Sequence, residues 1–164
     1  MKSNLKLFSD KLDTFIGRLF ISVNEEDRLI LLGINKHQDF IYQYYSVPAN
    51  GKCDKIKIQL LEYFSGKRKH FSLEFSFPGA TAFQIKVWKS LLTIPYGQTS
   101  SYGDVTKIIN NKKGYRAVGN AVGKNRIPII IPCHRVIKSS GKIGGFTGGI
   151  DKKIALLNLE EKFK

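Results

Sequence analysis

The feature that most constrains the fold of this chain is a change of pattern at Phe77-Pro78-Gly79. Before this point, apolar and polar residues alternate in several short stretches, which is the period of a half-buried strand. After it, apolar residues recur every three to four positions, as on one face of a helix. The change predicts two domains, residues 1–78 and 79–164. A total length of 164 residues suits one domain or two small ones.

The first half is predicted to be an α+β domain, a small sheet with a helix. Residues 14–23 and 28–34 are rich in β-branched and aromatic side chains, and the polar cluster 24–27 separates them. This pattern predicts a two-stranded hairpin. Residues 56–64 carry apolar side chains at helical spacing, so we expect a helix there. Residues 71–77 alternate apolar and polar side chains and are predicted to form a further strand.

The second half is predicted to be mainly α-helical. Apolar spacing indicates a helix from Thr81, as its N-cap, to about Leu92. Ser101 and Asp104 have the spacing of a capping box, so a short helix should begin at the residue after Ser101. Another helix is expected over about 115–122. This pair of short helices resembles a helix-turn-helix of the winged-helix kind.

The connections in the second half also carry structural signals. Residues 110–114 are polar and should form the turn between the two short helices, whereas IPIIIP at 127–132 is expected to be a buried extended segment. Five glycines within 139–149 predict a shaped loop. Asp151 is expected to cap a last helix, whose predicted inward residues are Ile154, Leu157 and Leu159.

Positive charge is concentrated after the domain boundary. The chain has 27 Lys+Arg and 13 Asp+Glu, a net charge of +14. Residues 79–164 hold 15 basic and 4 acidic residues, a net +11, which leaves +3 for residues 1–78. This skew favours nucleic acid as a partner, and we expect the first half to face away from it.

Composition argues against several other classes of protein. The 42% hydrophobic content is that of a globular chain, and no stretch reaches the ~18 apolar residues of a membrane span. Two cysteines are too few for a disulfide framework, and residues 1–12 lack the apolar core of a secretory signal. We therefore expect a soluble protein of the cytoplasm, or of the nucleus in a eukaryote. Cys53, His37 and His70 are too widely spaced for a zinc site, so no metal or cofactor is expected.

The pair Cys133-His134 is the strongest candidate for a catalytic site in the chain. A thiol becomes a strong nucleophile when a base or a nearby positive charge lowers its pKa. Adjacent residues of an extended segment point to opposite sides, so the pair can act together only if the backbone turns at Cys133. Pro132 fits such a bend. Without further context, a single cysteine is more often buried and inert.

The sequence PCHRV at 132–136 resembles the active-site signature of the O6-alkylguanine-DNA alkyltransferases, also called methylated-DNA–protein-cysteine methyltransferases. The resemblance covers essentially all of residues 80–164. The positions that carry it are Phe83 to Trp88, Pro95-Tyr96-Gly97, Ser101-Tyr102, Arg116 to Gly119, Asn125, Pro128 to Val136, Ser140-Gly141 and Gly148-Gly149.

This resemblance implies irreversible, single-turnover transfer of an alkyl group from O6-alkylguanine in duplex DNA to Cys133. His134 would act as the base through a bridging water, and Glu160 would orient His134 and stabilise its cation. The alkylated atom lies inside the base stack, so the nucleotide must be flipped into a pocket. The residues implied to bind the flipped base are Tyr102, Val122, Val136, Phe146 and Thr147.

The resemblance also implies a monomer that binds the minor groove of double-stranded DNA without sequence preference. Arg116 would fill the space of the extruded base, and Tyr102 would crowd the phosphate that rotates. Asn125 would bind backbone groups in the connecting turn and support the site. Arg135 receives no assigned role. A small helix face for close approach to DNA would consist of Ala117, Gly119 and Ala121.

Three other functions stay open from the residues alone. A DNA-lesion sensor would lack the reactive cysteine, which is present here as Cys133. A transcription regulator would read base edges, which the small helix face does not favour. A cysteine hydrolase using Cys133 and His134 would turn over repeatedly and would have no need of Arg116. Apart from the resemblance, Glu160 near a helix end would ordinarily be a solvated charge.

Overall fold

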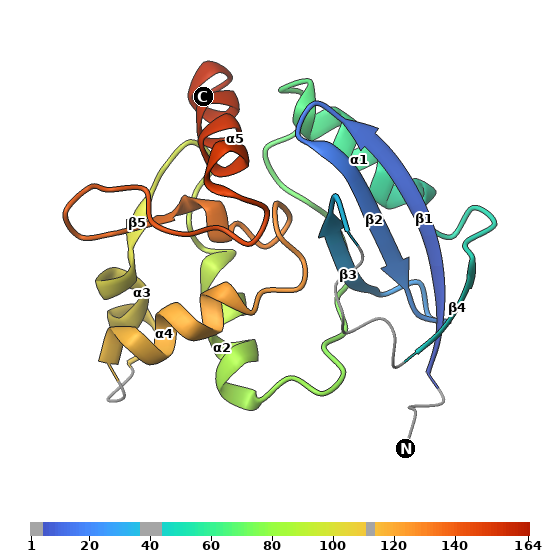
Figure 1. The fold of residues 1–164 in the computed structure, drawn as a ribbon, viewed down its shortest axis with the longest axis horizontal. Helices are drawn as coiled ribbons and strands as arrows, with labels where there is room; N and C mark the ends of the chain where they lie inside the picture. The colour runs from blue at the N-terminus through green and yellow to red at the C-terminus, as the bar shows by residue number, and fades with distance from the viewer. Residues whose placement is uncertain (1–4, 37–43, 111–113) are drawn as a thin grey trace. The chain divides into compact units, whose positions relative to one another are not determined.

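The computed structural model describes residues 5–36, 44–110 and 114–164 (Figure 1). The chain divides into two compact units, Met1–Pro78 and Gly79–Lys164. His37 and most of the predicted 110–114 turn lie outside the described residues. Within the described ranges, every helix is too short or too polar to cross a membrane.

The first unit is a small mixed sheet with one helix packed on it (Figure 1). The strand order is β3-β2-β1-β4. Strand β1 pairs antiparallel with β2 and parallel with β4, and β2 pairs antiparallel with β3. The elements are β1 (Lys6–Thr14), β2 (Gly17–Val23), β3 (Leu29–Ile34), β4 (Tyr45–Pro48) and the helix α1 (Asp54–Phe64).

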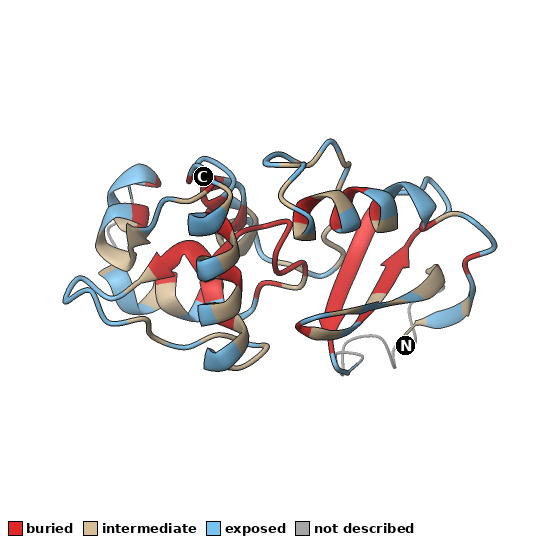
Figure 2. Cartoon of the chain, turned by 90° about the horizontal axis from the view of Figure 1, so that it is seen from above, coloured by how far each residue is buried: buried red, intermediate tan, exposed pale blue. Residues whose placement is uncertain are grey.

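The predicted hairpin and helix of this unit are confirmed. Strands β2 and β3 pair from Leu19 opposite Ile34 to Val23 opposite Leu29, and Figure 2 shows buried segments on both strands. Helix α1 buries one stripe at helical spacing, so its apolar face is what docks it in the core. The most buried apolar residues of that stripe are Ile56, Leu60 and Tyr63, each at most 2% exposed.

The predicted strand at 71–77 is wrong, and two strands of the sheet, the inner strand β1 and the edge strand β4, were not predicted. In the 71–77 segment, only Phe75 makes a ladder contact, an isolated parallel bridge to Leu29. The alternation reflects aromatic packing as well, since the Phe71 ring lies 5.4 Å from that of Tyr63. Strand β1 escaped prediction because four of its nine residues are charged.

The second unit is mainly helical. Helix α2 packs against both α3 and α4, which also pack on each other, and a short parallel pair of strands joins the start of α3 to the segment after Arg135. Trp88 lies fully buried among these helices and donates its indole N–H to the carbonyl of Ala121 at 2.8 Å. The elements are α2 (Ala82–Leu91), β5 (Ser100–Ser101), α3 (Tyr102–Ile108), α4 (Gly114–Gly123), β6 (Val136–Ile137) and α5 (Ile150–Lys162).

The N-caps predicted at Thr81 and Ser101 are confirmed. The Thr81 hydroxyl accepts the backbone N–H of Gln84 at 3.2 Å, and the Gln84 side chain accepts the N–H of Thr81 at 2.9 Å. Ser101 and Asp104 make the same reciprocal pair at the start of α3, at 3.0 and 3.1 Å. Each box satisfies two backbone donors that a helix start leaves without intrahelical partners.

The segment 127–132 is buried as predicted, but it is not extended. Its backbone forms a turn in which Ile131 N donates to Ile127 O at 2.9 Å. Ile129 has a φ of 74°, a left-handed conformation that is strained for a β-branched residue. The apolar run therefore predicted the burial of this segment correctly, but it did not predict that the backbone turns.

The last helix differs from its prediction in both cap and inward face. Gly149 occupies the N-cap position, and Asp151 lies in the first turn. Ile154 is 38% exposed, and Leu157 and Leu159 are only half-buried. The buried stripe of α5 consists of Lys153, Leu156 and Glu160, which follow the i, i+3, i+7 spacing of one helix face.

Removing the cap of α2 should destabilise the second unit measurably. Thr81→Ala leaves the Gln84 N–H without its side-chain acceptor and is expected to lower the free energy of unfolding by about 0.5–2 kcal/mol. Trp88 is the single tryptophan of the chain, so its fluorescence during urea unfolding reports on this unit. Thr81→Ser keeps the acceptor and is the control; an unchanged midpoint for Thr81→Ala would contradict the role of the cap.

Candidate active site

Cys133 lies on a tight turn that brings it to the edge of a pocket. Cys133–Arg135 form one turn of 3-10 helix, in which Arg135 N donates to Pro132 O at 3.0 Å. Cys133 N donates to Ile131 O at 2.8 Å. The backbone therefore turns at Cys133, which is the condition under which neighbouring Cys and His side chains can serve one site.

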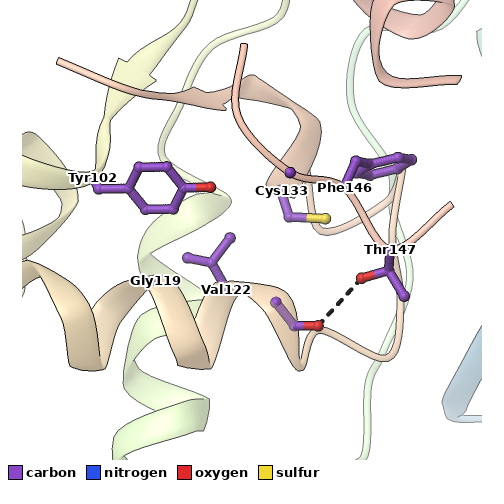
Figure 3. Close-up of a pocket in the computed structure, with 8 residues that line it drawn as sticks. Tyr102, Gly119, Val122, Cys133, Phe146 and Thr147 are labelled. Atoms are coloured by element: carbon purple, nitrogen blue, oxygen red, sulfur yellow. Dashed lines mark hydrogen bonds between the residues drawn. The ribbon is translucent and has the colours of Figure 1, made fainter. Parts of the chain in front are cut away.

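The pocket has a volume of about 210 Å³, and the Cys133 side chain forms part of its wall (Figure 3). Cys133 itself is 5% exposed, so the pocket is its route to solvent. Figure 3 shows the Tyr102 hydroxyl directed into the same space from the opposite side. The lining residues are Tyr102, Gly119, Val122, Gly123, Cys133, Gly145, Phe146 and Thr147.

Four of the five predicted base-binding residues line this pocket, and Val136 does not. Val136 is fully buried, and its carbonyl accepts a hydrogen bond from Lys153 Nζ at 2.6 Å. Thr147 contributes a link across the pocket rim, because its hydroxyl donates to Gly123 O at 3.2 Å (Figure 3). The glycine-rich loop is thereby joined to the end of α4.

Lys153 is a site-supporting residue that the sequence did not reveal. It is fully buried, and Nζ donates to Val136 O and, at 3.2 Å, to Gly145 O of the pocket loop. A buried lysine requires such partners because desolvation of its charge is costly. The available signal was its spacing of seven residues from Glu160 on one helix, which places both on the same face.

A buried ionic cluster stands behind Cys133. His134 Nε2 lies 2.7 Å from Glu160 Oε1, and the two side chains are 0% and 1% exposed. Arg135 donates to the same carboxylate from Nε at 2.9 Å and from Nη2 at 2.9 Å. The arginine side chain thus takes a role that sequence reasoning left open: it binds Glu160 with two nitrogens.

The cluster also connects segments that are distant in the sequence. Gly97 N donates to Glu160 Oε2 at 3.0 Å, and Arg135 Nη1 donates to Ile94 O at 2.6 Å. Glu160 comes from α5, whereas Ile94 and Gly97 belong to the connection after α2. The expectation of a solvated Glu160 is therefore wrong for this chain, and the carboxylate is satisfied by three separate donors.

Burial and charge set the protonation of this group. Burial by itself would raise the pKa of Glu160, but hydrogen bonds and charges from His134 and Arg135 lower that pKa to about 2. Burial lowers the pKa of His134, against the opposing effect of Glu160. Burial raises the pKa of the Cys133 thiol to about 11, although Asn125 and Lys153 act in the opposite direction. At neutral pH the resting site therefore holds a thiol, a neutral imidazole and a carboxylate.

Asn125 organises the turn that leads to Cys133. The side chain is 2% exposed, and its Nδ2 donates to Ile131 O at 2.9 Å. Its Oδ1 accepts Ile127 N at 3.0 Å. One amide group thus bridges both ends of the strained 127–131 turn, immediately before the nucleophile.

The predicted DNA-contacting residues of α4 do not share one face. Arg116 is exposed and Ala117 is half-buried, while Gly119 lines the pocket. Ala121 is only 3% exposed in the helical core, so the expected small surface face including Ala121 is wrong. The physical reason is helical period: positions 117 and 119 are about 200° apart, and 121 turns inward with 118.

Comparison with known proteins places the chain in a family. Residues 82–162 match the family described as 6-O-methylguanine DNA methyltransferase, DNA binding domain. A methylated-DNA–protein-cysteine methyltransferase of Methanosarcina barkeri is 41% identical over 162 residues, which cover 94% of this chain and 98% of the relative. The chain belongs to the methylated-DNA–protein-cysteine methyltransferase family. The resemblance noted at PCHRV therefore extends over nearly the whole chain and is not confined to a short motif.

Solved structures of this family have the same fold across both units. The O6-methylguanine methyltransferase of Mycobacterium tuberculosis shares 39% identity with this chain at a TM-score of 0.85, and the match covers 96% of this chain and 94% of that one. A structure of the same organism's protein in complex with DNA has a TM-score of 0.80 at 39% identity, covering 98% and 94%. The α+β architecture is therefore the family's own.

The second cysteine of this family member has a different environment. Cys53 is 0% exposed in the first unit, and its thiol lies 3.7 Å from Phe8 O and 3.9 Å from Ile21 O. Burial raises the pKa of Cys53 to about 12. Cys53 is therefore a poor nucleophile. Among the described residues, no three His, Cys, Asp or Glu side chains are grouped as metal ligands would be.

The buried cluster should make stability depend on pH. A carboxyl group whose pKa is lower in the folded chain stabilises the fold above its unfolded pKa and loses that contribution as the pH falls. For Glu160 this loss spans the range from its ordinary value of 4.5 down to about 2. Urea unfolding followed by Trp88 fluorescence should show a fall in stability over this range.

Glu160→Gln provides the comparison for this pH dependence. At pH 7 it should cost about 3–5 kcal/mol, because Arg135 keeps its buried charge and loses the ion pair. Between pH 4.5 and 2 its stability should fall less than that of the wild-type chain. Parallel pH profiles for the two proteins would show that Glu160 is not the group responsible.

Proposed function

We propose that this chain repairs DNA by moving the alkyl group of O6-alkylguanine in duplex DNA irreversibly onto Cys133, once per molecule. The observation that carries the proposal is the Cys133 thiol at the wall of a pocket, followed in the same turn by His134 and Arg135, which are bound to the buried Glu160. Membership of a family whose curated members are named for methylated DNA and a protein cysteine supports it.

The reaction is a displacement at the alkyl carbon. Cys133 Sγ forms a bond to that carbon while the bond from carbon to guanine O6 breaks, and the electron pair leaves with the guanine. The thiol proton passes through a bridging water to His134, and guanine takes up one proton to become neutral. The product is a thioether. Since no group in the pocket is placed to cleave a thioether, each molecule acts once.

The protonation states in the site suit this sequence. A buried thiol with a raised pKa does not ionise unaided, so a base must take its proton as attack begins. His134 is neutral at rest and binds Glu160 through Nε2, which directs Nδ1 to the role of proton acceptor. Glu160 then stabilises the imidazolium, and Arg135 keeps Glu160 ionised.

The pocket would recognise a guanine that has left the base stack. Val122 and Phe146 supply apolar walls, and the Tyr102 hydroxyl reaches the base from the opposite side. The Thr147 backbone N–H would donate to O6. The carbonyls of Cys133 and Val136 would accept from the exocyclic amine; a carbonyl has two lone pairs, so the Val136 oxygen can keep its bond from Lys153 as well.

Helices α3 and α4 would bind DNA as a helix-turn-helix of the winged-helix kind in the minor groove. Arg116 is exposed on α4 and would occupy the space that the flipped nucleotide vacates. Gly119, on the pocket side of α4, leaves room for close approach. Binding by a monomer would be independent of sequence and would weaken with salt, with a slope of about −0.9 per phosphate neutralised.

The decisive test is the fate of the cysteine. Incubation with an excess of duplex DNA containing one O6-methylguanine should methylate Cys133 stoichiometrically, with one lesion removed per molecule, as measured by peptide mass and base analysis. Cys53→Ser should behave like the wild type because Cys53 is fully buried in the first unit. An unmodified Cys133 beside intact lesion would refute the proposal, and turnover beyond one equivalent would favour a hydrolase.

A variant of Arg116 can distinguish an effect on nucleotide flipping from an effect on alkyl transfer. Arg116→Ala should slow repair of the duplex far more than alkyl transfer from free O6-benzylguanine, because the free base needs no extrusion. Single-turnover rates with both substrates measure the difference. Lys86→Ala removes an exposed charge from α2 and serves as the matched control. Equal losses with both substrates would contradict the flipping role.

A further inference from the structure

We propose that Tyr115 is a second DNA-contacting side chain of α4, which stacks on the base adjacent to the nucleotide that leaves the duplex. The inference rests on the proposed function and adds a residue to it. Tyr115 lies in the first turn of α4 and is 64% exposed, so its ring contributes little to the core. The ring is therefore available to stack on a ligand bound beside α4.

Tyr115 lines a groove beside the base pocket. The groove has a volume of about 560 Å³ and shares Tyr102, Gly119 and Gly145 with the pocket, so the two hollows are contiguous. Among the described residues, its lining includes two cations, two serines and no acid. The groove residues are Tyr102, Gly103, Tyr115, Arg116, Gly119, Lys138, Ser139, Ser140, Gly144 and Gly145.

The geometry of α4 places Tyr115 in line with the pocket. Positions 115, 119 and 122 follow the i, i+4, i+7 spacing of one helix face. Gly119 and Val122 line the pocket, so Tyr115 continues the same face one turn towards the start of the helix. Arg116 is about 100° further round α4, and the two side chains therefore occupy different positions along a bound strand.

The chemistry of the groove fits a nucleic acid strand. Aromatic rings stack on bases of any sequence, and nearby cations bind the phosphates that connect them. Tyr115 supplies the ring, and Arg116 and Lys138 supply the positive charge. Ser139 and Ser140 add hydroxyl groups of the kind that contact phosphate oxygens. An apolar protein partner would not require this combination.

Nucleotide flipping creates the surface that Tyr115 would cover. When one nucleotide leaves the stack, each neighbouring base loses a stacking partner, at a cost of a few kcal/mol per step. Arg116 fills the vacated space with a charged planar group. A tyrosine in line with the pocket can stack on the neighbouring base of the same strand and offset part of that cost.

The test uses 5-iodouracil placed next to the lesion, because ultraviolet light links this base to an aromatic ring stacked on it. The full chain with Cys133→Ser prevents alkyl transfer during the measurement. Irradiation of the complex with lesion-containing duplex should give a cross-link that peptide mass assigns to Tyr115. Tyr115→Ala should lose this cross-link, and Tyr115→Phe should keep it.

Duplex affinity gives the second measurement. Tyr115→Ala should weaken binding about 5- to 150-fold, the equivalent of the ~1–3 kcal/mol of one base stack. Tyr115→Phe should retain nearly all of the affinity. Tyr45→Ala is the matched control, since Tyr45 is 68% exposed but belongs to β4 of the first unit.

Two outcomes would overturn the inference. One is a cross-link to Tyr102 or another residue together with wild-type affinity for Tyr115→Ala. The other is an equal loss, for Tyr115→Ala in the Cys133-containing chain, of duplex repair and of reaction with free O6-benzylguanine, which would indicate a structural role. Failure of the proposed function is distinct, because cross-linking and binding are read without any alkyl transfer.

Discussion

The ion pair between Arg135 and Glu160 is the interaction on which the active site depends. A single carboxylate accepts from the turn that carries the nucleophile, through His134 and Arg135, and from Gly97 after α2. Because it projects from α5, it fixes two distant segments to one helix. Hydrogen bonds must offset the desolvation of these charges, and both oxygens of Glu160 have donors. The same carboxylate raises the pKa of His134 against the larger lowering effect of burial, so stability and chemistry share one carboxylate.

Helix α5 departs from the usual pattern in which the buried face of a helix is apolar. Its buried stripe carries Lys153 and Glu160, and only Leu156 between them is apolar. The lysine supports carbonyls of Val136 and the pocket loop, while the glutamate supports the catalytic turn. A prediction from hydrophobicity alone therefore assigns the wrong face of α5 to the core. Ile154, which was predicted to point inward, is 38% exposed. Buried charges of this kind are rare unless paired, which is why their presence on one face indicates a function.

The sequence predicted what local interactions decide. The caps at Thr81 and Ser101 depend on residues three positions apart, and the β2–β3 hairpin depends on alternation and a polar loop; each is confirmed. The 127–131 turn was missed because a left-handed Ile129 has no sequence signal and is held from outside by Asn125. The positions of the candidate site came from the PCHRV resemblance. The roles of Arg135 and Lys153 could not be predicted, since spacing alone does not distinguish a buried charge from a solvated one.

The positions of the acidic residues explain why the surface of the second unit is basic, as its composition is. Asp104 caps α3, Asp151 lies in the first turn of α5 beside Lys152, and Glu160 is buried with Arg135. Only Glu161, within 3.4 Å of Lys164, is a surface acid without a place in a helix start or in the cluster. These are the four acids of residues 79–164. Glu160 is buried and the two acids at helix starts each lie beside a lysine, so the surface of this unit keeps its excess of basic side chains even though Arg135 and Lys153 are buried.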